Sequence, residues 1–233
     1  MKKSKVFTIA ALSLCLVGTA GCSSMTNMGK GALIGGGGGA GVGAGIGALI
    51  GGGKGAGIGA AIGAAVGAGA GTLIGRKMDQ QKKQLEEELA QKAQVETVTD
   101  QNGLQAIKVT FNSGILFPTN GTTLNTSERQ TLSGFASNLI SNPETNVQIF
   151  GYTDNTGTMA VNERVANGRA DAVRTFLVNS GVSGSRITAE GIPMADYVAS
   201  NETAEGRAQN RRVEIYITAN KQMIQQAENG TLQ

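Results

Sequence analysis

The spacing of apolar positions predicts a folded region between Ile107 and Thr218. Alternating apolar and polar side chains, typical of half-buried strands, predict strands at residues 107–111, 146–152, 186–191 and 211–218. Residues 124–142 and 159–179 instead repeat apolar positions every three to four residues, which predicts two helices. Because strands and helices alternate, we expect an α+β domain whose sheet is covered by helices on at least one face.

A different pattern precedes this region. Glycine occupies every fourth position from Gly31 to Gly75, which places one bare row along a helix and lets a second backbone approach closely. Such a helix is unfavourable in water, where each glycine costs about 1 kcal/mol relative to alanine. In a bilayer, unpaired backbone groups cost more. Lys54 divides the segment into halves of about one membrane span each, so residues 31–75 are expected to form a membrane helical hairpin. A disordered glycine-rich spacer is the alternative.

Two further segments flank the expected domain at residues 104–219. Residues 76–96 are rich in helix formers and lack glycine and proline, with Met78, Leu85 and Leu89 as a thin apolar seam. We therefore expect residues 76–103 to be a semi-rigid helical linker, with a short coiled coil as the alternative. The polar tail at residues 220–233 is expected to be loose.

The N-terminus has the features of a signal peptide at residues 1–21, with a basic start and a short apolar run. The small residues before Cys22 resemble the lipobox of bacterial lipoproteins, which predicts a lipidated N-terminus at residues 22–30. Secretion with a chance cysteine at the cleavage point is the alternative. Three lysines leave with the signal peptide, so the 20 basic residues fall to 17 and balance the 17 acidic ones. Nothing in this charge points to nucleic acid.

Composition excludes several kinds of chemistry. The chain has no histidine and two cysteines, of which Cys15 lies in the signal peptide and Cys22 is assigned to lipid. This removes histidine-based triads and most metal sites. No carboxylate pair stands out as a hydrolase site, so we expect neither an enzyme nor a cofactor.

One arginine lies on the apolar stripe of the second helix. Arg169 falls four residues after Val165 and four before Val173, and Asn162 is also in phase. A guanidinium on a core-facing seam is costly unless it is paired. Asp154 precedes the helix, and together the two charges could hold a zwitterion, since arginine forks onto a carboxylate and aspartate accepts an ammonium. The alternatives are that Asp154 is a turn or cap residue and that Arg169 reaches out to the surface.

These residues carry a family resemblance. The segments TDNTG, NERVANGRADAV and AEGRAQNRRVEI together resemble the OmpA-like peptidoglycan-binding domain, over about residues 107–218. With the lipobox and glycine zipper in front, the chain is similar to YiaD-type outer-membrane lipoproteins. The resemblance implies a β-α-β-α-β-β sandwich that holds the diaminopimelate side chain of the peptidoglycan stem peptide. It assigns Asp154 to the ammonium and Arg169 to the carboxylate, with secondary positions at Thr153, Asn162, Arg211 and Arg212.

The resulting hypothesis is a non-enzymatic tether between the outer membrane and the cell wall, with its folded domain in the periplasm. Its expected partners are peptidoglycan and outer-membrane lipid. The glycine segment could also contact a second copy or another membrane protein. The alternative is an outer-membrane assembly factor that acts through the glycine segment and uses wall binding only to localise.

Overall fold

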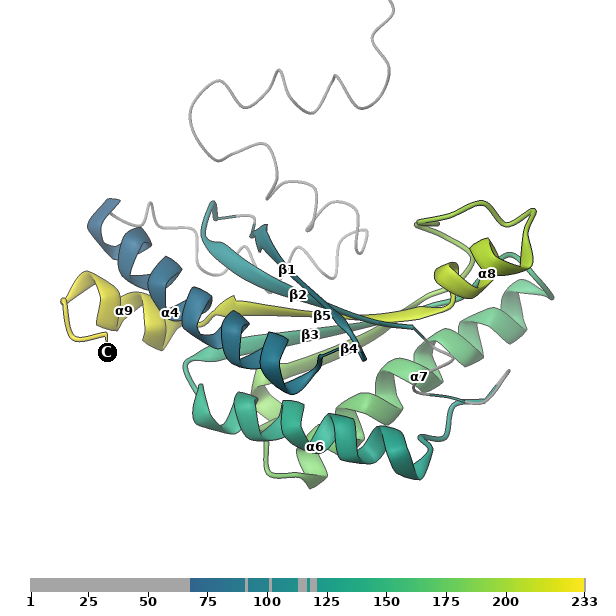
Figure 1. Ribbon diagram of the computed structural model, residues 1–233, viewed down its shortest axis with the longest axis horizontal. Helices are drawn as coiled ribbons and strands as arrows, with labels where there is room; N and C mark the ends of the chain where they lie inside the picture. Colours follow the sequence, from purple (N-terminus) through teal and green to yellow (C-terminus); the bar gives the residue numbers. More distant parts are fainter. Residues whose placement is uncertain (1–67, 91, 101, 113–116, 118–120, 233) are drawn as a thin grey trace, which may run out of the picture.

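The computed structural model describes residues 68–90, 92–100, 102–112, 117 and 121–232 (Figure 1). The predicted signal peptide, Cys22 and the glycine segment up to residue 67 lie outside these residues. Among the described helices, none is both long and apolar enough to cross a membrane.

A twisted sheet of five strands forms one layer, in the order β1-β2-β5-β3-β4. The strands are β1 (Gln94–Thr99), β2 (Gln105–Asn112), β3 (Thr145–Tyr152), β4 (Ile187–Ile192) and β5 (Arg212–Ala219). β3 and β4 are parallel, and the other neighbours are antiparallel. The parallel pair is joined through a helix, as parallel strands require a long crossover.

Helices α4 (Ala68–Glu88), α6 (Thr126–Ser141) and α7 (Met159–Asn179) cover one face of the sheet (Figure 1). Two short helices lie at opposite ends, α8 (Ala204–Asn210) on the right in Figure 1 and α9 (Lys221–Glu228) on the left. The core between the layers includes Val213, Ile215 and Ile217, the alternate residues of β5, all fully buried. From β2 to β5 the elements follow the expected β-α-β-α-β-β order, with α8 added before the last strand.

The predicted linker at residues 76–103 differs from the structure. Its helical part, α4, docks on the domain: Met78 and Leu85 are fully buried in the shared core, and the buried Gln81 donates to Asn138 Oδ1 at 2.9 Å. The apolar seam is therefore real, but the domain itself covers it rather than a coiled-coil partner. After α4 the segment contains strand β1, which pairs with β2 along its whole length.

The end of the glycine segment also differs from the prediction. Residues 68–75 form the first turns of α4, and Ala70 and Ile74 are buried in the domain core. Gly75 lies under Gln105 of β2, where an added Cβ would sit 3.3 Å from its side-chain oxygen. The folded unit therefore begins before the boundary predicted at residue 104.

The polar tail is a helix rather than a loose end. Asn220 caps α9 by accepting from the backbone N–H of Met223 at 3.0 Å. Met223, Ile224 and Ala227 are buried in the same core as α4, beside which α9 lies in Figure 1. Three apolar residues on one face were enough to fix a helix that is otherwise polar.

Candidate binding site

The loop between β3 and α7 forms one wall of a pocket. Thr158 caps α7, with its hydroxyl accepting from the backbone N–H of Val161. Asn162, one turn into α7, donates to the carbonyls of Thr156 at 2.7 Å and Thr158 at 3.1 Å. Gly157 has a φ of 86°, which favours glycine at that position. These contacts hold the loop rigidly over the start of the helix.

Asp154 lies within this loop and is only 4% exposed. Its Oδ1 accepts from the backbone N–H of Thr156 at 2.9 Å and from the Thr156 hydroxyl. Its Oδ2 forms an ion pair with Arg211 Nη1 at 2.6 Å. The predicted turn role is therefore correct, since Asp154 bonds the backbone two residues ahead, although the cap of α7 is Thr158. The same carboxylate also lines the pocket.

The pKa of Asp154 reflects opposing effects. Burial alone would raise it, but the hydrogen bonds from Thr156 and Arg211, together with the charge of Arg211, lower the pKa below the usual aspartate value. Asp154 is therefore an anion at neutral pH and can accept a cation.

Arg169 is 2% exposed and is the largest fully buried side chain in the described residues. Its Nε donates to the carbonyl of Gly121 at 3.1 Å, and its guanidinium lies 5.5 Å from the ring centre of Phe117. Burial, followed by the nearby positive charge of Arg211, lowers the pKa of Arg169 to about 10. The alternative in which Arg169 reaches out to the surface is wrong, yet the side chain stays charged at neutral pH.

Two glycines let α7 approach the sheet closely and so place Arg169. A Cβ added at Gly151 of β3 would lie 2.3 Å from the carbonyl oxygen of Ala166. One added at Gly191 of β4 would lie 2.3 Å from the backbone nitrogen of Asn167. Both distances are far inside van der Waals contact, so these two positions exclude other residues. The buried arginine is held in place by backbone packing on either side of it.

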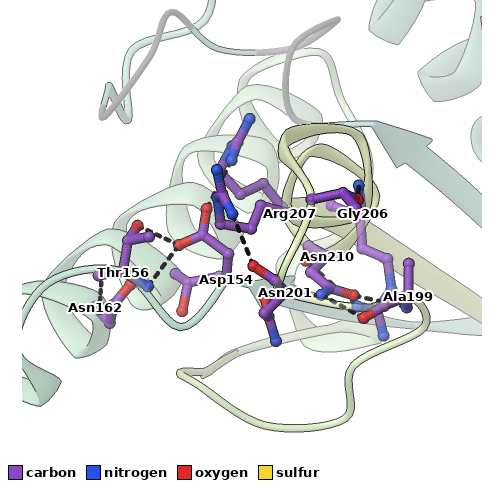
Figure 2. A network of polar contacts seen from close by, with 12 residues as sticks. Asp154, Thr156, Asn162, Ala199, Asn201, Gly206, Arg207 and Asn210 are labelled. Atoms are coloured by element: carbon purple, nitrogen blue, oxygen red, sulfur yellow. Dashed lines mark hydrogen bonds and ion pairs between the residues drawn. The ribbon is translucent and has the colours of Figure 1, made fainter.

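These elements enclose a pocket of about 280 Å³. It brings together five of the six predicted ligand-binding residues and adds four more, and its lining is Thr153, Asp154, Thr156, Val161, Asn162, Val165, Arg169, Arg207 and Arg211. Figure 2 shows Asp154, Thr156 and Asn162 in one hydrogen-bonded group, with Arg207 of α8 beside them. A carboxylate and guanidinium groups thus face one small, partly enclosed space, which suits a ligand carrying both an ammonium and a carboxylate.

Comparison with known proteins shows which family the folded part of the chain belongs to. Residues 116–211 match the OmpA family, and residues 1–79 match the YMGG-like Gly-zipper. The folded part of this chain is an OmpA-like domain.

Two curated relatives match the OmpA-like part of this chain. The Escherichia coli K12 protein named "Probable lipoprotein YiaD" is 43% identical over 106 residues, covering 46% of this chain and 48% of that protein. "Peptidoglycan-binding protein ArfA" of Mycobacterium tuberculosis H37Rv is 39% identical over 112 residues, covering 48% of this chain and 34% of that protein. This chain therefore spans half or less of the length of these relatives.

Solved structures share the fold of the OmpA-like domain. The cell wall anchor of the T6SS from Pseudomonas aeruginosa superposes with a TM-score of 0.51 at 30% identity, covering 58% of this chain and 97% of that one. A MotB-like protein from Desulfovibrio vulgaris gives a TM-score of 0.55 at 24% identity, covering 65% and 96%. The second likeness concerns the fold alone.

Arg212 was predicted to bind ligand, but in this OmpA-like domain it lies outside the pocket. It is 3% exposed, its Nε donates to Glu214 Oε1 at 2.7 Å, and its guanidinium stacks 3.8 Å from the ring centre of Tyr152. Its Nη2 donates to the carbonyl of Asp196 at 3.0 Å. Arg212 opens β5, whereas Arg211 precedes the strand. Arg212 therefore belongs to a buried network. Its bond to Asp196 holds the loop after β4 in place.

Sequence reasoning missed Arg207 as a pocket residue. It lies four residues before Arg211, so both project from the same side of α8 and its C-terminal end. That spacing was visible in the segment GRAQNRR, and it was the available signal. Thr156, Val161 and Val165 were missed as well, since their positions depend on how the loop before α7 folds.

Proposed function

We propose that this protein binds peptidoglycan non-covalently, gripping the ammonium and carboxylate of the diaminopimelate side chain in the stem peptide. Asp154 accepts the ammonium and Arg169 forks onto the carboxylate, while Thr153, Asn162 and Arg211 shape the site. The observation that carries the proposal is that Asp154, 4% exposed, and Arg169, 2% exposed, both line one pocket. Relatives named for peptidoglycan binding and for cell wall anchoring support it.

The rest of the chain fits a tether. An acylated Cys22 would hold the protein in the outer membrane, with the OmpA-like domain in the periplasm. Lipid chains contribute about 0.8 kcal/mol per buried CH₂, so such an anchor is durable. Single wall contacts can then be weak, because many copies on one membrane surface act together through their effective concentration. The match of residues 1–79 to the YMGG-like Gly-zipper supports a specific role for the glycine segment.

The test is sedimentation of the purified protein with isolated sacculi. Wild-type protein is expected in the pellet and to be released by added meso-diaminopimelate. Asp154→Asn and Arg169→Ala are each expected to stay in the supernatant, because removing one partner of a desolvated charge contact costs about 2–5 kcal/mol.

Arg174→Ala is the matched control, since Arg174 is an exposed residue of the same helix α7. It should sediment like the wild type, and circular dichroism should report folded protein for all variants. Retention of folded Arg169→Ala on sacculi would contradict the proposed site.

A further inference from the structure

The pocket carries more positive charge than a simple zwitterion needs. Among the described residues that line it, three are arginines, Arg169, Arg207 and Arg211, and one is an acid, Asp154. With all four ionised, the lining has an excess of two positive charges. A ligand group with one ammonium and one carboxylate adds no net charge and leaves that excess in place. The pocket is therefore better matched to a ligand with more carboxylates than ammonium groups.

Arg207 has guanidinium donors that remain available for such a group. Its Nη1 donates to the backbone carbonyls of Asn201 at 2.7 Å and Glu202 at 3.2 Å. In the described part of the chain, these are the protein contacts of its guanidinium, so Nε and Nη2 can donate to a ligand. Arg211 differs, because its Nη1 forms an ion pair with Asp154 at 2.6 Å, whereas both partners of Arg207 are uncharged carbonyls. Figure 2 shows the bond from Arg207 to Asn201 on the α8 side of Asp154.

The backbone around Arg207 fixes it before a ligand arrives. Thr203 caps α8 by accepting from the N–H of Gly206 at 3.0 Å. At Gly206 an added Cβ would lie 1.9 Å from the carbonyl oxygen of Ser200. The backbone of α8 therefore packs directly against the loop that precedes it. Asn210 closes the same loop, with its side chain bonded to Val198, Ala199 and Asn201. A guanidinium held this way loses little conformational freedom when it binds a carboxylate.

We propose that Arg207 binds a second carboxylate of the ligand, so that the pocket selects stem-peptide ends with two carboxylates and one ammonium. This inference rests on the proposed function and names the class of ligand for the same site. A diaminopimelate residue at the end of a stem tripeptide meets the requirement. Its amide-linked amine is uncharged, and the residue keeps one ammonium, the carboxylate beside it, and the carboxylate at its other stereocentre. Asp154 and Arg169 take the first pair, and Arg207 takes the remaining carboxylate.

The experiment compares two synthetic peptides by isothermal titration calorimetry with the purified protein. One is L-Ala-γ-D-Glu-meso-diaminopimelate, and the other is the same tripeptide with the carboxylate beside the peptide-linked amine converted to a carboxamide. Wild-type protein is expected to bind the free acid roughly tenfold more tightly than the carboxamide, as expected for loss of one charge-assisted contact. Arg207→Gln should bind both peptides with about the affinity of the wild type for the carboxamide.

Arg174→Gln, an arginine change on the exposed face of α7, should keep the full preference. Equal wild-type affinity for the two peptides, or an unchanged preference in folded Arg207→Gln, would overturn the role of Arg207 and leave the proposed function standing. Absence of binding to either peptide would overturn the proposed function and this inference with it.

Discussion

At the scale of single residues, Asp154 both stabilises its loop and lines the pocket. Asp154 forms a tight turn with Thr156, pairs with Arg211 and still faces the pocket. Arg169 was found in the sequence because it broke an apolar stripe, and it is buried in the structure. Arg212 could not be separated from Arg211 by sequence alone. Strand periodicity assigns neighbours to different faces, but the assignment depends on where the strand begins.

Arg169 is expected to serve binding more than folding. Replacing it with methionine removes the bond to Gly121 but also relieves the cost of burying a charge. The free energy of unfolding of Arg169→Met should therefore differ from wild type by less than about 1 kcal/mol, while sacculus binding is lost. Urea denaturation measures the first quantity. A loss of several kcal/mol would show that the arginine is a structural residue.

Asp154 is expected to make stability depend on acid pH. Because its pKa is lower in the folded protein than in the unfolded chain, the ionised carboxylate stabilises the fold above the unfolded value of about 4. That contribution disappears as the pH falls through the lower folded value. The unfolding free energy of wild type should then drop more steeply below about pH 4 than that of Asp154→Asn. Urea titrations at a series of pH values measure this, and parallel curves for the two proteins would contradict it.

At the scale of elements, the close packing of α7 on β3 and β4 positions the pocket. Strands β2 to β5 and helices α6 and α7 were predicted from the periodicity of their apolar residues. β1 and α9 were not, since their few apolar residues are explained only by the surfaces they cover. Val95 and Val98 alternate poorly among polar neighbours in β1, and α9 has three buried residues among five others. Short polar elements at the edge of a domain depend on tertiary packing rather than on their own pattern.

A pair of glycine substitutions tests the close contact. Gly151→Ala should lower the free energy of unfolding by more than about 2 kcal/mol, because its Cβ would overlap backbone atoms of α7. Gly134→Ala is the control within helix α6, where an added Cβ meets nothing within 4 Å. It should stabilise by about 0.5–1 kcal/mol through helix propensity. Thermal or urea unfolding measures both, and a neutral Gly151→Ala would show that α7 can shift without cost.

At the scale of the whole molecule, the start of α4 and the pocket residue Arg207 lie at opposite ends of the domain. α4, whose first turns are the end of the glycine segment, begins beside α9 at one end of the sheet, and α8 with Arg207 lies at the other (Figure 1). Lys77 of α4 also pairs with Glu144 at 3.3 Å, so this helix is fixed to the domain. A pocket at the far end of the domain from the start of α4 fits the proposed tether, in which the residues before α4 would lead to the membrane.

Removing residues 31–67 while keeping Cys22 separates the tether from the assembly factor. The deletion ends before Ala68 because α4 contributes Ala70 and Ile74 to the core. If the protein is a tether, the shortened chain should still link outer-membrane vesicles to sacculi in a co-sedimentation assay. Loss of that link in a folded, lipidated protein would favour a role for the glycine segment itself.

The most direct measurement is a titration of the purified OmpA-like domain, residues 68–233, with meso-diaminopimelate, followed by NMR. The account predicts saturable shifts of the Arg169 Nε–H and of the Thr156 amide that bonds Asp154. In Arg169→Met, which lacks the Nε–H, the shift of the Thr156 amide should be abolished. Saturable binding that leaves these two signals unmoved, or no binding at all, would contradict it.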